Sequence, residues 1–254
     1  MSTKTTVDLD REHVAGRAAG TAGFVATIGT FAALALASGV ARGTPLADEG
    51  GQKVLVLQNL RENAGSETMV VVLRCLSVVL VIAVGLFFVK ATADRDGRPA
   101  GVLRWLTAVA PLVLAAAIAG SYLAAHGAAQ DFAAGAQTSA RAEALLDDSG
   151  AVQATRVLEI AAHVLFGVWI VLLSWRAMAC GLLTRTLGYW GVGAAVIGAF
   201  LPIGDALFMG WLVSLAFVAW GWWPGGLPRA WEEGRMIPWD DDSTSGAVAP
   251  GVGR

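Results

Sequence analysis

The chain is poor in the residues from which most catalytic and metal sites are built. Its 254 residues include two cysteines and three histidines, and only 15% are charged. It has no Cys-x-x-Cys pair, no zinc or iron–sulfur spacing, no GxSxG or HExxH signature and no glycine-rich phosphate loop. With a net charge of -2 and no dense run of Lys and Arg among aromatic residues, it also lacks the pattern of a nucleic-acid-binding protein. These absences favour a protein that is not an enzyme and needs no cofactor, although they leave both questions open.

What the chain has instead is a series of long apolar runs. Hydrophobic residues make up 56% of it, and its mean hydropathy is +0.60. A helix of about 20 apolar residues can cross a bilayer, because its backbone satisfies its own hydrogen bonds in hydrocarbon. The sequence predicts an all-α polytopic membrane protein, a bundle of six transmembrane helices, at residues 18–41, 69–89, 103–125, 157–176, 187–203 and 206–223. This transmembrane domain, residues 18–223, lies between an N-terminal tail, 1–17, and a largely disordered C-terminal tail, 224–254.

The basic residues predict which way the spans face. Twelve Lys and Arg residues fall on one side of the six spans and five on the other, and cytoplasmic loops carry such an excess. Six tryptophans lie at those ends of the spans that face the basic side: Trp105, Trp175, Trp190, Trp220, Trp222 and Trp223. Tryptophan is favoured there because its ring can be buried while its indole N–H stays near the headgroups. We therefore expect a multi-pass protein of the bacterial cytoplasmic membrane with both termini in the cytoplasm. The alternative, a first span cleaved as a signal at Ala35-Leu36-Ala37, is less favoured because the apolar stretch is longer than usual.

Two connections on the outer side carry helical patterns. Val54, Leu57 and Leu60 share one helical face, which predicts a short helix lying on the outer leaflet. Residues 140–146 are expected to form a second helix, which the turn residues that follow bring to an end.

Several spans carry small residues four positions apart, for example Gly16 and Gly20 or Ala115 and Ala119. Small side chains let helix backbones approach closely. We expect the lipid bilayer to be the main partner, and these faces to be where a homo-oligomer or a membrane-protein partner would pack.

Ionisable residues in or near the spans form the candidate site, because such a side chain in hydrocarbon costs at least about 2.5 kcal/mol unless it is paired or solvated. We expect this polar cluster at the outer ends of the spans, and its members are Arg74, His126, Arg156, Glu159, His163 and Asp205. Arg156, Glu159 and His163 share one helix face, so Glu159 is expected to bond with either neighbour. His126 is expected at the same depth on the preceding helix.

Three kinds of site fit this polar cluster. In a metal site, His126, Glu159 and His163 would supply nitrogen and oxygen ligands for zinc, copper or nickel. In a haem site, the two imidazoles would be axial ligands. In a proton or cation relay, Glu159 and His163 would change charge near neutral pH. A plainer interpretation is that these side chains reach the headgroups, with Arg156–Glu159 as an ordinary ion pair and Asp205 in a turn.

The connection between the fourth and fifth predicted spans carries a distinctive pattern. Residues 175–191 contain Gly181-Leu182-Leu183, then Arg185, then Leu187-Gly188 and Gly191. This linker resembles that of small actinobacterial six-span membrane proteins, the group called domain of unknown function 4386. The resemblance covers about residues 157–223. It implies a six-helix fold in the cytoplasmic membrane, with no established activity and no site residues to carry over.

The sequence thus predicts an integral membrane protein of unknown activity. The leading hypothesis is that the outer-facing polar cluster binds or conducts a small solute or ion. The alternatives are a metal- or haem-binding membrane redox protein that uses His126 and His163, and a non-catalytic accessory subunit of a membrane complex.

Overall fold

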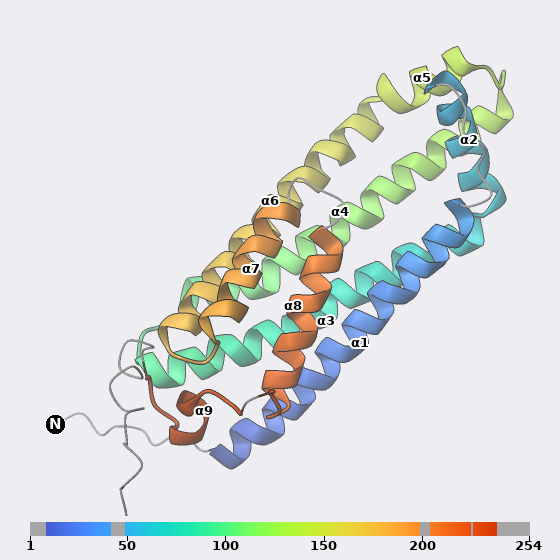
Figure 1. Ribbon diagram of the computed structural model, residues 1–254. Helices are drawn as coiled ribbons and strands as arrows, with labels where there is room; N and C mark the ends of the chain where they lie inside the picture. The colour runs from blue at the N-terminus through green and yellow to red at the C-terminus, as the bar shows by residue number, and fades with distance from the viewer. Residues whose placement is uncertain (1–8, 42–48, 199–203, 225, 238–254) are drawn as a thin grey trace, which may run out of the picture. The chain divides into compact units, whose positions relative to one another are not determined.

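The computed structural model describes residues 9–41, 49–198, 204–224 and 226–237. These ranges contain helices and connecting turns and no strand (Figure 1), which confirms the predicted all-α fold. The helices are α1 (Leu9–Ala41), α2 (Glu49–Glu62), α3 (Ala64–Asp96), α4 (Gly101–Ala134), α5 (Ser139–Asp147), α6 (Gly150–Ala179), α7 (Arg185–Gly198), α8 (Gly204–Ala219) and α9 (Arg229–Glu233).

Four of these helices, α1, α3, α4 and α6, are long and apolar enough to cross a membrane. They contain 33, 33, 34 and 30 residues. At a rise of about 1.5 Å per residue, each is longer than the roughly 30 Å of hydrocarbon in a bilayer. Each also continues beyond its predicted span, as α3 does in running on to Asp96. The chain is therefore a polytopic helical membrane protein.

The last two predicted spans correspond to shorter helices. α7 has 14 residues and α8 has 16. They measure about 21 and 24 Å, which is less than the thickness of the hydrocarbon. α7 packs against α8, and residues 199–203, which join them, lie outside the described part of the chain. A total of six crossings therefore stays a prediction.

The chain divides into two compact units. The terminal unit contains Met1–Ala22, Ala83–Thr107 and Gly167–Arg254, and the central unit contains Gly23–Ile82 and Ala108–Phe166. The boundaries fall within α1, α3, α4 and α6, so each long helix contributes one segment to each unit. The chain therefore passes between the two units several times, and each unit is built from segments that are far apart in the sequence.

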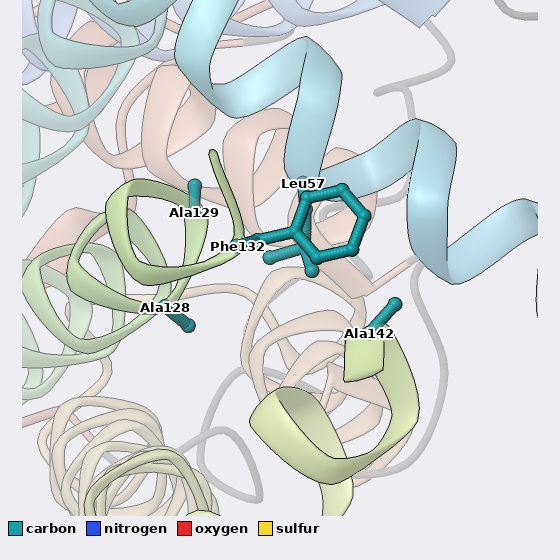
Figure 2. Packing of buried hydrophobic residues seen from close by; sticks show 5 residues of the cluster. All are labelled: Leu57, Ala128, Ala129, Phe132 and Ala142. Carbon is teal, nitrogen blue, oxygen red and sulfur yellow. The ribbon is translucent and has the colours of Figure 1, made fainter. Parts of the chain in front are cut away.

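A buried apolar cluster ties two connecting helices of the central unit to α4 (Figure 2). Its members come from α2, α4 and α5 and are Leu57, Ala128, Ala129, Phe132 and Ala142. Val54 and Leu60 of α2 pack against this cluster. The helix predicted from Val54, Leu57 and Leu60 is confirmed, and its position at the outer leaflet stays a prediction. The apolar face of α2 is covered by protein, because α4 and α5 supply the surface against which it packs.

The helix predicted at residues 140–146 is confirmed as α5. The Thr138 side chain accepts a hydrogen bond from the Arg141 backbone N–H and caps the start of this helix. Lys53 of α2 donates to Asp147 at 2.5 Å and lies 3.6 Å from Glu143. The hydrogen bond with Asp147 raises the pKa of Lys53 above its ordinary value. The two connecting helices are thus joined by an ion pair as well as by the apolar cluster.

In the terminal unit, glycines let helices approach closely. Gly16 and Gly20 of α1 lie against the carbonyl oxygens of Ala219 and Ala216 on α8. A Cβ at Gly20 would be 2.7 Å from the Ala216 oxygen, closer than a carbon atom can come. This small-residue face is therefore used within the chain, where it packs α1 on α8.

The C-terminal segment packs on the terminal unit. Trp231 of α9 is buried, its ring stacks on Phe87 with centroids 5.6 Å apart, and its indole N–H donates to the Leu182 carbonyl at 2.9 Å. Ile237 is buried too. Residues 226–237 of the C-terminal segment therefore have a defined place on the terminal unit, because Trp231 and Ile237 occupy buried positions. The expectation that the tail at residues 224–254 is largely disordered stays a prediction. Residues 238–254 lie outside the described part of the chain.

Candidate functional site

His126 belongs to a row of polar side chains near the end of α4, in the central unit. Its Nε2 atom lies 3.1 Å from the Gln130 amide nitrogen. Its ring stacks on Tyr122 with centroids 5.6 Å apart, and the Tyr122 hydroxyl is 2.7 Å from the Thr68 hydroxyl of α3. Because the Gln130 nitrogen donates, Nε2 accepts and the neutral ring carries its proton on Nδ1. That Nδ1 atom is buried and has no hydrogen-bond partner among the described residues.

Arg156, Glu159 and His163 occupy successive turns of α6, as their spacing predicts. Arg156 is exposed, whereas Glu159 and His163 are half-buried. His163 Nδ1 donates to the backbone carbonyl oxygen of Glu159 at 2.8 Å. Within the described ranges, no hydrogen bond or ion pair joins the Glu159 carboxylate to either neighbour. The tautomer of His163 is thus fixed by the main-chain carbonyl of Glu159, one turn earlier on the helix. The side-chain carboxylate of Glu159, which was expected to make this contact, does not.

The register of α4 and α6 separates the two histidines. α5 connects the end of α4 to the start of α6, so the two helices run antiparallel (Figure 1). Ser121 of α4 donates to the Thr155 carbonyl of α6 at 3.4 Å, which places these two residues at one level. At about 1.5 Å per residue, His126 lies about 8 Å from that level in one direction and His163 about 12 Å in the other. The expectation that His126 shares the depth of His163 is therefore wrong, because α6 starts at Gly150 and passes α4 in a different register.

Arg74 is the residue that shares the depth of Glu159 and His163. The thiol of Cys75, the next residue on α3, donates to the Ala115 carbonyl of α4 at 3.4 Å. That level lies about 9 Å from the level of Ser121, on the side toward His163. The half-buried side chains of Arg74, Glu159 and His163 therefore occupy one layer of the central unit, which we call the charged layer. His126 lies about 15 Å from the level of Arg74, beyond the level of Ser121.

The described residues do not gather into a set of metal ligands. No group of three or more His, Cys, Asp or Glu side chains able to hold a metal ion occurs in the described part of the chain. Two axial imidazoles must bracket one haem iron, and a separation of about 20 Å between His126 and His163 does not fit that geometry. Asp205 lies in the first turn of α8, and its side chain is outside the described part of the structure.

An ion pair of the terminal unit was not predicted from the sequence. Arg95 donates through Nη1 and Nη2 to the two carboxylate oxygens of Glu12, at 2.7 and 3.0 Å. Its Nε donates to the Ala230 carbonyl at 2.9 Å, and its guanidinium lies 5.0 Å from the ring centroid of Trp231. The Arg95 side chain is fully buried and that of Glu12 is 12% exposed. This pair joins the ends of α1 and α3 to α9.

The next residue of the chain makes a second such pair. The Asp96 carboxylate accepts two hydrogen bonds from Arg176 of α6, both at 3.1 Å, and one from the backbone N–H of Arg98 at 2.9 Å. Arg176 also donates to the Arg98 carbonyl. In the sequence these charges resemble an ordinary solvated turn, and the only signal is the alternation of sign at residues 94–96. Because the charges of both pairs are bonded to each other and to main-chain groups, the pairs anchor helices rather than offer a site to a ligand.

Comparison with known proteins identifies a family without an assigned activity. No curated protein and no solved structure matches the chain. The family described as Domain of unknown function (DUF4386) matches residues 19–225. This match covers well over half of the chain, and it includes the linker at residues 175–191 as well as all four long helices in large part. The chain therefore belongs to the family Domain of unknown function (DUF4386).

Proposed function

We propose that this membrane protein binds or conducts a small solute or ion through the polar residues of its central unit. The observation that carries the proposal is the charged layer of Arg74, Glu159 and His163. Ionisable side chains inside apolar helices are costly, and in membrane proteins they mark the paths of solutes, ions or protons. Because His163 donates through Nδ1 to the main chain, its Nε2 atom is left as an acceptor for a ligand.

The polar row of Thr68, Tyr122, His126 and Gln130 supports the same proposal. It offers donors and acceptors near the end of α4, where His126 lies about 15 Å from the level of Arg74 in the charged layer. The buried N–H of His126 Nδ1 lacks a partner among the described residues. A ligand that accepts a hydrogen bond from it would relieve the cost of an unsatisfied buried donor, about 1–3 kcal/mol. In this proposal a solute meets the polar row first and the charged layer second.

We further propose that the protein lies in the cell membrane with the polar row facing outward and both termini in the cytoplasm. The excess of basic residues on one side of the spans supports this orientation. The contacts of Arg95 with Glu12 and Ala230 agree, because they hold the first helix, the end of α3 and α9 together in one unit. In a cysteine-free background, a membrane-impermeant maleimide should label Gln137→Cys and not Arg98→Cys on intact cells. The reverse pattern would overturn the orientation.

Ion flux into proteoliposomes tests the proposed function. We would measure proton, sodium and potassium entry with fluorescent indicators for the wild-type protein, Glu159→Gln and the control Glu62→Gln. Glu62 is an exposed carboxylate of α2 in the same unit, so its substitution makes the same change of charge outside the charged layer. We expect at least one ion to enter faster than into protein-free liposomes, and Glu159→Gln to abolish that difference. Wild-type flux equal to that of empty liposomes for all three ions, or a flux unchanged in Glu159→Gln, would contradict the proposal of ion conduction through this layer.

A further inference from the structure

A cavity of 160 Å³ lies between α1 and α3 in the terminal unit. Arg11, Glu12 and Ala15 line it from α1, and Phe87, Lys90 and Asp94 line it from α3. It is similar in size to a cavity of about 150 Å³ that accepts a benzene molecule, so it has room for a small polar group. None of its residues belongs to the polar row or the charged layer of the central unit.

Charges of both signs face this cavity. Glu12 is already bound there, because both of its carboxylate oxygens accept hydrogen bonds from Arg95. The exposed side chains of Arg11 and Lys90 bring two positive charges, and the exposed side chain of Asp94 brings one negative charge. A ligand that carries an anionic group beside a cationic one matches this arrangement.

On α3 the cavity lies where the apolar part of the helix ends, and on α1 its lining residues precede Arg17, the last charged residue before the apolar run. On α3 the apolar run stops at Val89, and Lys90 is the first charged residue after it. One turn deeper, large apolar side chains are exposed on both helices, Val14 at 73% and Leu86 at 37%. Charged groups at such a boundary lie at the level of lipid headgroups, while exposed apolar side chains next to them face the acyl chains.

We propose that this cavity binds the headgroup of a phospholipid that carries both a phosphodiester and a primary ammonium, as phosphatidylethanolamine does. Arg11 and Lys90 donate hydrogen bonds to the phosphate oxygens, and Asp94 accepts one from the ammonium. Basic pockets between transmembrane helices are known to take lipid headgroups. The exposed Val14 and Leu86 favour a lipid over soluble phosphoethanolamine, and Asp94 favours this headgroup over an anionic one such as that of phosphatidylglycerol.

Native mass spectrometry of the purified full-length protein tests this assignment. The protein would be mixed with equal amounts of phosphatidylethanolamine, phosphatidylglycerol and phosphatidylcholine of the same acyl chains, and the lipid retained would be counted. We expect the wild type to retain phosphatidylethanolamine above the other two. Lys90→Gln should lower that retention about tenfold, the effect of losing one hydrogen bond to a charged group. Asp94→Asn should remove the preference over phosphatidylglycerol while leaving the phosphate bound.

Arg104→Gln is the matched control, because Arg104 is an exposed basic residue at the start of α4 that does not line the cavity. Arg11→Gln repeats the test on the other helix if the Lys90 variant does not fold. Equal retention of the three lipids by the wild type, or equal losses in Lys90→Gln and Arg104→Gln, would overturn the proposal. So would displacement of the lipid by soluble phosphoethanolamine at the same concentration, which would make this a solute site. Ion flux through the charged layer is a separate readout, so failure of either proposal leaves the other standing.

Discussion

Arg95 of α3 and Glu12 of α1 form a buried ion pair in which two hydrogen bonds, 2.7 and 3.0 Å long, join the guanidinium to both carboxylate oxygens. The same guanidinium also donates to the carbonyls of Ala91 and Ala230. It therefore has partners from its own helix, from the first helix and from the C-terminal segment. Removing a partner of a buried charge destabilises the folded protein, because the charge is then left without compensation away from water.

The first prediction concerns that pair. Arg95→Met leaves the Glu12 carboxylate largely buried without its partner, and such a loss destabilises proteins by about 3–5 kcal/mol. We expect a clear fall in the unfolding temperature of the detergent-purified protein. Arg98→Met is the control, because the Arg98 side chain is exposed and, among the described residues, only its backbone atoms are hydrogen-bonded. Replacing both members, with Glu12→Leu added, should restore part of the loss. Equal melting of the two single variants would contradict this account.

A second prediction compares two glycines of the same helix. A Cβ at Gly191 would strike the Ser174 hydroxyl and lie 2.5 Å from the Trp211 indole nitrogen, and both of those side chains are fully buried. Gly193 has nothing within 4 Å of the corresponding position. Gly191→Ala should therefore destabilise the protein by about 1–3 kcal/mol through overpacking.

Gly193→Ala should have the opposite effect and raise the free energy of unfolding by about 0.5–1 kcal/mol, because alanine loses less backbone entropy than glycine when a helix forms. Thermal unfolding of the two variants beside the wild type measures both effects. A Gly191→Ala protein as stable as Gly193→Ala would show that α7 does not pack on α6 and α8 as described.

The third prediction tests the apolar cluster of the central unit. Leu57 is fully buried, whereas its neighbour Val56 is 47% exposed. Leu57→Ala should cost about 2–5 kcal/mol, and Val56→Ala less than about 0.5 kcal/mol. Hydrogen exchange should accelerate in α2 and α5 for Leu57→Ala alone. Exchange that is equally fast in both variants would mean that α2 rests on lipid, as the sequence predicted.

The fourth prediction concerns pH. Cys180 follows α6, and burial, together with the nearby Asp96 carboxylate, raises the pKa of its thiol from 9.0 to about 11. Because the folded state disfavours the thiolate, its contribution to stability is complete below about pH 9 and is lost as the pH rises toward 11. In a Cys75→Ser background, iodoacetamide should react with the folded protein slowly at pH 8.

Unfolding temperature should also fall more steeply between pH 8 and 10 in that background than when Cys180→Ala is added. Both cysteines are free, so no disulfide complicates the comparison. Rapid alkylation at pH 8 without unfolding would show that the thiol is accessible and its pKa ordinary.

Local pattern was enough for much of the fold. The long apolar runs predicted α1, α3, α4 and α6, because the length of apolar sequence needed to cross a bilayer is a property of one segment at a time. The turn residues after Leu146 likewise marked the end of α5. What covers α2 was not predictable from such local pattern. Val54, Leu57 and Leu60 show which face of the helix is apolar, but not whether lipid or protein covers that face.

The candidate site was predictable only in part. That Arg156, Glu159 and His163 share a face follows from helical geometry, and α6 confirms it. That Arg74 joins the depth of Glu159 while His126 does not depends on contacts such as Ser121 with Thr155 and Cys75 with Ala115. Those contacts set the register between helices.

The sequence by itself determined that this protein is built of membrane-crossing helices, because the length of an apolar run depends only on consecutive residues. Only the tertiary structure decided which charges meet. Arg95 and Asp96 are neighbours in the chain, yet one binds Glu12 of α1 and the other Arg176 of α6. Side chains one position apart on a helix point about 100° apart, so their partners are fixed by which helices pack on each side, and that depends on residues far away in the sequence.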